Sequence, residues 1–272
     1  MVSTEEKRRL IEQLIDVENK LISSEDIKRQ FYDVLLRDTN GGKLYKYRTF
    51  DKKGYSLENL KEGTLHCSKP SAFNDPFDCK IGITLEGLYE AKYGEKIKSM
   101  EAMLEKFGFV VQGEGGLGCL CTDYKNRMMW SHYADSHTGF CIEYDFSEHT
   151  GANLFDLPLP VIYAKDRPIF PWDVVIDNNE DNMQRAQLQI VLSMLMKDNV
   201  WEYENEWRIF VSSQKSSEYK MPKVSCIYLG VAISEENRTK ILGIASELNI
   251  PVKQMKVDRG VYDLHAEKVK NI

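Results

Sequence analysis

The 272-residue chain has no apolar run long enough to cross a membrane. Even its longer apolar stretches, such as Ile190-Val191-Leu192, are interrupted by polar residues within a few positions. The amino terminus carries Thr4-Glu5-Glu6-Lys7, whereas a signal peptide would have an apolar segment there. These absences predict a cytoplasmic protein with no membrane partner.

The chain also lacks the cysteine spacing of a zinc site or of a dithiol redox centre. Its six cysteines lie singly, except that Cys119 and Cys121 have one residue between them rather than two. Most lie in apolar stretches, so we expect reduced thiols in the core. His132 and His137 are five residues apart, not the four that place two imidazoles on one helix face, so we predict no metal site. A nucleophilic pair of Cys121 with His132 has no support beyond the presence of both residue types.

Neither a phosphate-binding P-loop nor a nucleophile elbow occurs in the sequence. The glycines from Gly113 to Gly118 imitate a dinucleotide-binding turn, but they precede a predicted strand instead of following one. The net charge of −6 argues against sequence-independent binding to a phosphate backbone, and it leaves room for a local basic groove.

The composition is typical of a globular protein, with 42% hydrophobic, 11% aromatic and 29% charged residues. From Thr4 to Leu36 there is no glycine or proline, and apolar residues recur at helical spacing. This pattern predicts an N-terminal helical hairpin over residues 1–40, which could pack on the main domain or on a second subunit as a homodimer. The turn Asn40-Gly41-Gly42 then opens a main domain over residues 41–272.

Short strands separated by turns follow, and they predict an α+β fold with a mixed, strongly twisted β core and flanking helices. Within it, loop 69–78 has two prolines and short polar side chains, so we expect an ordered loop that Phe73 and Phe77 hold against the core. Strands are predicted at residues 44–50, 63–68, 118–122, 139–145, 161–163, 201–211, 224–231 and finally 252–257, and helices at 56–60, 88–107, 127–134, 181–197 and 234–248.

A pair of carboxylates, Glu204 and Glu206, stands out on the predicted strand 201–211. Alternation sends both side chains to one face, and Arg208 lies on the same face. Three charges placed together either satisfy one another as ion pairs or serve a substrate. The sequence leaves both interpretations open.

Other segments carry polar and aromatic residues of kinds that are uncommon in a hydrophobic core. Arg48 ends the segment Tyr45-Lys46-Tyr47-Arg48 and suits a solvated strand face as well as a phosphate-binding role. Ser68 suits a turn or a substrate contact. Asn74 and Asp75 can hold their loop through local hydrogen bonds, and Trp130-Ser131-His132-Tyr133 forms a further such segment.

These motifs in combination resemble a bacterial family catalogued as domain of unknown function 2971. The resemblance covers about residues 44–235 and implies kinship without an activity. It rests on Leu44-Tyr45-Lys46-Tyr47-Arg48, Phe73-Asn74-Asp75-Pro76-Phe77-Asp78, Met129-Trp130-Ser131-His132-Tyr133-Ala134 with His137 and Gly139, and Tyr203-Glu204-Asn205-Glu206-Trp207-Arg208.

A weaker resemblance does imply chemistry. Arginine, serine and a Glu-x-Glu pair follow one another here in the order seen in ADP-ribosyltransferases of the arginine-serine-glutamate class. By that resemblance Arg48 would hold the phosphates of NAD, and Ser68 would brace the nicotinamide pocket. Glu206 would stabilise the oxocarbenium-like ribose and Glu204 would activate the acceptor. The candidate catalytic residues are thus Glu206, Glu204, Arg48 and His132, and the candidate cofactor-binding residues are Arg48, Ser68, Tyr47, Asn74, Trp130 and Tyr133.

The leading hypothesis is therefore an intracellular enzyme that uses a nucleotide, with NAD as the small molecule and an acceptor macromolecule still to be identified. The resemblance places such activities in toxins or phage-defence effectors. The alternative is a non-enzymatic sensor or interaction module that binds a nucleic acid end, a peptide or a partner protein. A metal-dependent hydrolase using Asp75, His132, His137 and Glu206 is a third hypothesis. An enzyme predicts a cavity shared by Arg48, His132 and Glu206, whereas a module predicts ion-paired carboxylates and no cavity.

Overall fold

A computed structural model describes residues 2–19, 25–80, 115–148, 157–169, 180–212 and 217–269. Its main sheet has eight strands, all antiparallel to their neighbours except for one parallel pair. The fold is therefore α+β with a mixed β core, which confirms the predicted class. The strands, in sheet order, are β12 (Leu264–Lys268), β11 (Val252–Val257), β10 (Val224–Leu229), β4 (Phe140–Asp145), β1 (Lys43–Arg48), β3 (Gly115–Cys121), β8 (Glu206–Ser212) and β5 (Leu159–Pro160), and β10 and β11 form the parallel pair.

Smaller elements surround this sheet. Two further strand pairs are β2 (Thr64–His66) with β9 (Glu218–Lys220) and β6 (Ile162–Ala164) with β7 (Met196–Asp198). The helical elements are α1 (Thr4–Asn19), α2 (Glu25–Asp38), α3 (Tyr55–Glu62), η1 (Pro70–Ala72), α5 (Arg127–Tyr133), α7 (Glu180–Leu195), η3 (Asn199–Glu204) and α8 (Glu235–Glu247).

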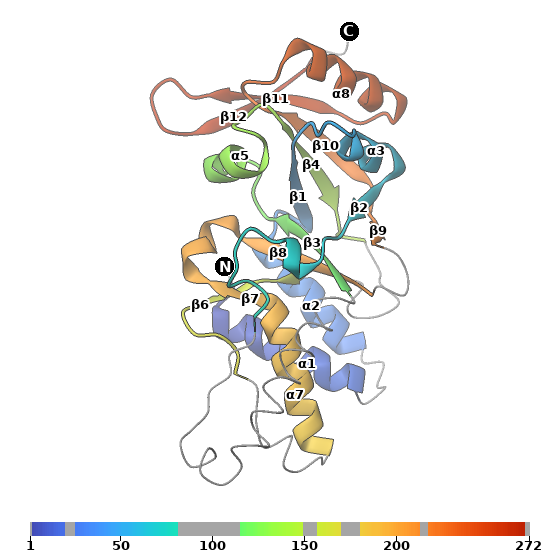
Figure 1. Ribbon diagram of the computed structural model, residues 1–272. Coiled ribbons are helices and arrows are strands. Elements are labelled where there is room, and N and C mark those ends of the chain that lie inside the picture. Colours follow the sequence, from blue (N-terminus) through green and yellow to red (C-terminus); the bar gives the residue numbers. More distant parts are fainter. Residues whose placement is uncertain are drawn as a thin grey trace.

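The N-terminal helices α1 and α2 form the predicted hairpin and lie beside α7 at one end of the molecule, whereas α8 and the β11–β12 hairpin lie at the other end (Figure 1). Leu14 of α1 and Phe31 of α2 are each 1% exposed and belong to the core that also contains sheet residues. The ring of Phe31 meets that of Trp207 edge-on, with centroids 6.4 Å apart. The apolar faces of these helices are thus covered within the chain, and the homodimer stays a prediction.

The main sheet divides between β1 and β3. β1 pairs with β4 along its whole length, and β3 does so with β8, but β1 and β3 pair with each other only at Tyr45 and Cys121. Beyond this pair the two strands diverge, with β1 running toward α8 and β3 toward β2 (Figure 1). The divergence opens a fork in the sheet, and side chains of both strands face it.

Two glycines let the chain cross over β3 beside this fork. A Cβ atom added at Gly116 would lie 2.7 Å from the Cys67 carbonyl oxygen, and one at Gly118 would lie 2.6 Å from the Leu65 side chain. Side chains at these positions would push β2 away from β3. The close approach brings Ser68 into a backbone bridge with Leu117, at the edge of the fork.

The structure corrects the predicted elements in several places. Residues 199–204 form η3, so the carboxylate strand begins at Glu206 and not at residue 201. Strand β12 follows the strand predicted to be the final one. Phe77 is 62% exposed and does not hold its loop against the core, because its ring lies under the guanidinium of Arg167. The helix predicted at residues 88–107 lies outside the described residues.

All six cysteines are free thiols, and all are buried except Cys119, which is half-buried. This agrees with the core role predicted for most of them. Among the helices that the structure describes, none has the length and apolarity needed to cross a bilayer.

The packing of the N-terminal hairpin predicts how mutations in α2 affect stability. We expect Phe31→Ala to lower the free energy of unfolding by about 3–5 kcal/mol, because it removes a buried ring that contacts the sheet. The matched control is Leu36→Ala on the same helix, where the side chain is 42% exposed, and its effect should stay within about 0.5 kcal/mol. Urea denaturation measures both, and equal effects would contradict a shared core.

Candidate functional site

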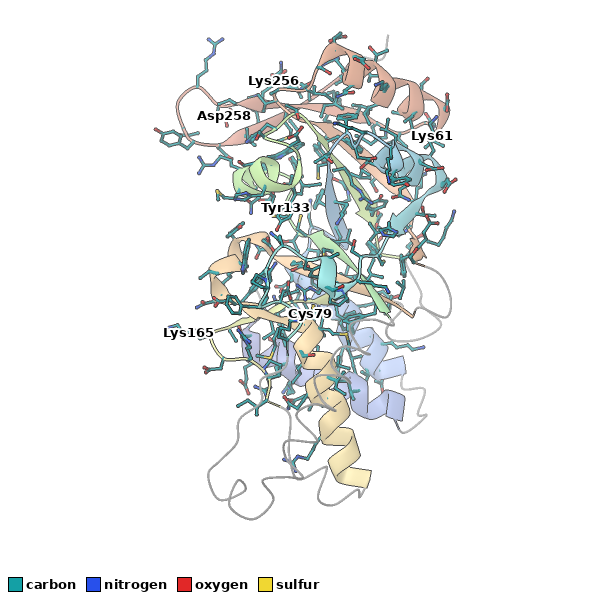
Figure 2. The ribbon with its side chains drawn as sticks, in the orientation of Figure 1. Lys61, Cys79, Tyr133, Lys165, Lys256 and Asp258 are labelled. Atoms are coloured by element: carbon teal, nitrogen blue, oxygen red, sulfur yellow. The ribbon has the colours of Figure 1, made fainter. Side chains whose placement is uncertain are left out.

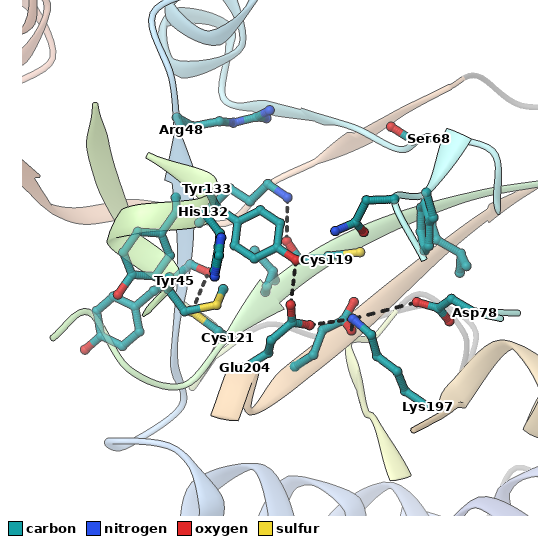
Figure 3. A pocket seen from close by; sticks show the side chains of 18 of the residues that line it. Tyr45, Arg48, Ser68, Asp78, Cys119, Cys121, His132, Tyr133, Lys197 and Glu204 are labelled. Carbon is teal, nitrogen blue, oxygen red and sulfur yellow. Dashed lines mark hydrogen bonds and ion pairs between the residues drawn. The ribbon is translucent and has the colours of Figure 1, made fainter. Parts of the chain in front are cut away.

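A cavity of about 450 Å³ occupies the fork between β1 and β3 (Figure 3). Its walls also include the loop that follows β2, helix α5, and the junction between η3 and β8. This volume lies within the range of about 300–1,000 Å³ that is usual for small-molecule sites. The divergence of two strands in one sheet therefore creates a space large enough for a ligand.

Most of the residues predicted from the sequence line this one cavity. His132 lies exposed on its surface, whereas the two glutamates are buried in it. Trp130 does not line it: this side chain is fully buried, and its Nε1 donates to the Tyr124 carbonyl oxygen at 2.7 Å. The predicted residues that do line it are Tyr47, Arg48, Ser68, Asn74, His132, Tyr133, Glu204 and Glu206.

Arg208 organises the carboxylates below the cavity. Its guanidinium is 0% exposed, and its Nη1 and Nη2 donate to the two oxygens of Asp78 at 2.9 and 2.7 Å. Its Nε and Nη2 donate to the two oxygens of Glu206 at 3.0 Å each. Nη1 also donates to the Met194 carbonyl oxygen at 2.6 Å, at the end of α7. One arginine thus holds two carboxylates by bidentate pairs and joins three parts of the chain.

Lys197 completes this buried cluster. Its Nζ lies 2.5 Å from Oε2 of Glu204, 3.4 Å from Oε2 of Glu206 and 3.8 Å from Oδ2 of Asp78. The side chains of all four residues are at most 5% exposed. With Arg208, two cations face three carboxylates, so the cluster carries a net charge of −1. Lys46, which lines the same cavity, is attracted by Glu206 and offsets part of this negative charge.

The cations keep Glu206 ionised. Burial alone would raise the pKa of this carboxyl group, but the charges of Arg208 and Lys197 outweigh that effect and lower it to about 2. The same attraction raises the pKa of Lys197 against the opposing effect of its burial. Glu206 is therefore a fixed anion at neutral pH.

Local turns bring Glu204 and Glu206 to the same lysine. The carboxylate of Asp198 accepts from the Val200 amide and caps η3, which ends at Glu204. Asn205 then adopts a left-handed conformation with φ of 44°, and β8 begins at the next residue. Both carboxylates face Lys197 because of this turn, and not because they alternate along one strand.

Asn126 connects α5 with η3. Its side-chain oxygen accepts from the amides of Met128 and Met129 and so caps α5. Its Nδ2 donates to the Tyr203 carbonyl oxygen at 2.5 Å. The residue before Glu204 is thereby fixed to the start of the helix that carries Tyr133, and the two side chains meet in the cavity.

Tyr133 points from α5 into the centre of the molecule, whereas Lys256 and Asp258 belong to the β11–β12 region away from the cavity (Figure 2). Its hydroxyl donates to Oε1 of Glu204 at 2.5 Å. Burial, followed by the contact with Glu204, raises the pKa of this phenol. Hydrogen bonds thus join Tyr133, Glu204 and Lys197 in the cavity, and Asn74 lines the same cavity.

The opposite wall is cationic. Arg48 and Lys46 lie two residues apart on β1 and both line the cavity. Nε and Nη2 of Arg48 are buried and, in the described part of the chain, have no hydrogen-bond partner. Nζ of Lys46 donates to the Cys119 carbonyl oxygen at 2.7 Å and so spans the fork. Burial lowers the pKa of both groups, and the repulsion from Arg48 lowers that of Lys46 further. This wall therefore favours an anionic ligand.

Nucleophilic and metal chemistry find little support here. Burial raises the pKa of the Cys121 thiol to about 12, so this thiol stays protonated near His132. Within the described ranges, no three His, Cys, Asp or Glu side chains form a group that could hold a metal ion. Asp75 instead accepts from the Phe77 amide in its loop at 2.8 Å, and His137 stacks on Trp130.

The arrangement combines both outcomes that distinguished an enzyme from a binding module. Arg48, His132 and Glu206 share one cavity, as an enzyme predicts. Glu206 is also fully ion-paired, as a module predicts, although Lys197 joins Arg208 as the partner instead of Lys46 or Arg48. The cavity and the ion-pair network are thus parts of the same site.

Two members of this site, Lys197 and Asp78, were not among the residues predicted from the sequence. Lys197 is the last residue of the predicted helix 181–197, and no motif lies beside it. Asp78 is the last residue of the loop 69–78, and the sequence did hold a signal for it. A buried carboxylate needs a cation, and Arg208 has more donors than Glu206 alone can accept.

Fold and site together define an α+β protein with a polar cavity above a buried cluster of ion pairs. Residues 129–209 match the model of a family described as "Protein of unknown function (DUF2971)". The match runs from α5 into β8 and supports the predicted resemblance to that family over a shorter range than 44–235. No curated protein and no solved structure matches the chain, so the resemblance to ADP-ribosyltransferases has no support from these comparisons.

The depressed pKa of Glu206 predicts a loss of stability in acid. A carboxyl group with a pKa of about 2 in the folded state and 4.5 as its ordinary value stabilises the fold fully above pH 4.5, and this contribution disappears as the pH falls toward 2. It amounts to roughly 3 kcal/mol. We expect Glu206→Gln to be less stable than the wild type at neutral pH, and the difference to shrink below pH 4.5.

Urea denaturation across this pH range measures the effect. The matched control is Glu247→Gln, which removes an exposed carboxylate at the end of α8 and should leave the stability unchanged at every pH. A difference between Glu206→Gln and the wild type that is constant with pH would contradict the ion-pair account.

Proposed function

We propose that the cavity binds a nucleotide with a diphosphate group, and that the protein is a nucleotide-using transferase with NAD as its substrate. The proposal rests on the guanidinium of Arg48, which lines the same cavity as Glu204 and Glu206. Two of its nitrogens are buried and have no hydrogen-bond partner in the described residues. The cationic and anionic ends of one cavity match the two ends of such a substrate.

The wall formed by Arg48 and Lys46 suits the phosphates. A guanidinium offers paired donors to phosphate oxygens, and a lysine adds a point charge. Nε and Nη2 of Arg48 have no hydrogen-bond partner in the described residues, and Nζ of Lys46 donates to a carbonyl oxygen, so an anionic ligand would give the guanidinium the partner that it lacks. Ser68 lines the cavity across from Arg48 and offers a hydroxyl there (Figure 3).

The floor of the cavity suits the reacting sugar. Breaking the bond between nicotinamide and ribose leaves positive charge on the ribose, and a fixed negative charge nearby stabilises it. The cluster of Glu204, Glu206, Asp78, Lys197 and Arg208 has one more negative charge than positive. Its side chains are already held by hydrogen bonds, so little reorganisation is needed when the charge develops.

Aromatic side chains complete the fit. Tyr45, Phe73 and Tyr133 line the cavity and offer ring faces or edges to a planar heterocycle. Two planar groups, an adenine and a nicotinamide, belong to NAD. The proposal thus assigns a chemical counterpart to each kind of wall in the cavity.

The complete ion pairing of Glu206 favours a second candidate, a non-enzymatic module that binds the nucleotide as a signal. In this case the carboxylates would only stabilise the fold, and the ligand would be bound without being cleaved. The cellular setting implied by the resemblance, a cytoplasmic bacterial effector of toxin or phage-defence type that modifies a macromolecule, belongs to the first candidate.

Arg48→Met tests the binding site with little risk to folding, because it removes a cation that has no partner in the described residues. We expect the dissociation constant for NAD, measured by calorimetry, to rise by about 10- to 100-fold, as for the loss of a charge-assisted hydrogen bond. The thermal stability should not fall. Arg259→Met, in the exposed β11–β12 hairpin, is the matched control and should bind as the wild type does.

A release assay separates the two candidates. The wild type is incubated with NAD and a cell lysate as the source of acceptor, and released nicotinamide is measured by chromatography. Binding with release supports the transferase, and binding without release supports the module. If the wild type neither binds NAD nor releases nicotinamide, the proposal of an NAD-using protein is wrong.

A further inference from the structure

The two glutamates of the Glu-x-Glu pair have different partners. Both oxygens of Glu206 are bound by Arg208, and one of them also lies near Lys197. Glu204 has no arginine: its Oε2 faces Lys197, and its Oε1 accepts only from the hydroxyl of Tyr133 among the contacts of the described chain. A carboxylate held by a bidentate arginine is poorly placed to accept a proton. The one bound to a neutral phenol is better placed.

Tyr133 connects Glu204 with the space of the cavity. A phenol oxygen has one donor and can accept two hydrogen bonds. Here the donor serves Glu204. Acceptor positions of the oxygen are left for a hydroxyl group of a ligand, and the side chain is half-buried at the cavity wall.

The charge of the cluster suits the arrival of one proton. Two cations and three carboxylates leave a charge of −1, so a proton on Glu204 makes the cluster neutral. Lys197 keeps Glu206 and Asp78 as neighbours when Glu204 is neutral. The cluster therefore has a stable form both before and after a proton transfer.

From this geometry we infer that the hydroxyl of Tyr133 relays the proton of the attacking group, which is a hydroxyl or a water, to Glu204, and that Glu206 takes no proton and contributes only its charge. The inference rests on the proposed function and adds Tyr133 to the acceptor-activating role that the resemblance gives to Glu204. Tyr133 would touch the acceptor, and Glu204 would act through it.

The acceptor oxygen forms a bond to the ribose carbon as the bond from that carbon to nicotinamide breaks, and the electron pair leaves with nicotinamide. The proton of the acceptor passes to the Tyr133 oxygen, and the Tyr133 proton passes to Oε1 of Glu204. No oxidant, reductant or further reactant takes part.

Azide provides the test, because it attacks carbon without having a proton to lose. With NAD and water alone, we expect Tyr133→Phe and Glu204→Gln each to lower the rate of nicotinamide release by about 100-fold or more. Azide should restore the rate of Tyr133→Phe and give the ribosyl azide, detected by mass spectrometry. Glu204→Gln should recover only in part, because it also removes a charge from the floor of the cavity. Azide should not restore the rate of Arg48→Met, where binding is the defect. The dissociation constant of Tyr133→Phe for NAD, measured by calorimetry, should equal that of the wild type.

Tyr228→Phe is the matched control. Tyr228 also donates to a buried carboxylate, Glu143, at 2.7 Å, but neither residue lines the cavity. The change should leave nicotinamide release unaltered. This control separates the loss of a phenol–carboxylate hydrogen bond in general from the loss of the one at Glu204.

The results separate the inference from the proposed function. If the wild type releases nicotinamide and Tyr133→Phe does so equally fast, or if azide fails to rescue Tyr133→Phe, the inference is wrong and the proposed function stands. If the wild type releases no nicotinamide with any acceptor, including azide, both are wrong. A defect in Tyr133→Phe that azide repairs, with normal NAD binding, supports both.

Discussion

The site depends on the hydrogen bonds and ion pairs made by the buried guanidinium of Arg208. Its donors bind Asp78 in the loop after β2, Glu206 at the start of β8 and the Met194 carbonyl oxygen at the end of α7. Asp78 and Glu206 line the cavity, and the end of α7 lies behind them. A buried ion pair of this kind adds little net stability over an apolar core, but the loss of one partner leaves the others uncompensated. The network therefore favours one arrangement of these three segments over other arrangements, and it adds little net stability to the fold.

Much of this arrangement could be predicted from β8 alone. Alternation along a strand correctly placed Glu206 and Arg208 on one face and Trp207 on the other, where it meets Phe31. The same rule failed one step earlier. Asn205 takes a left-handed conformation, and the chain before it is the short helix η3, so Glu204 reaches the cluster by a turn that a period of two does not describe.

The partners of the carboxylates were beyond a local pattern. Lys197 lies on strand β7 and Asp78 in a loop, and only the fold makes them neighbours of Glu206. The aromatic residues show the same limit, because Trp130 and Tyr133 belong to one short helix but only Tyr133 lines the cavity. Trp130 is buried against Tyr47 instead. Residue type predicted a site in these segments, and side-chain direction decided which members form it.

The single pairing between β1 and β3 has a mechanical consequence. Five strands on one side of it and three on the other are each joined by longer ladders, so Tyr45 and Cys121 mark the most compliant line across the sheet. A rotation about that line would change the width of the cavity, and the hydrogen bond from Lys46 to the Cys119 carbonyl oxygen, which spans the fork, would oppose it. A ligand that binds both to Arg48 on one side and to the carboxylate floor on the other would brace the two parts of the sheet against each other.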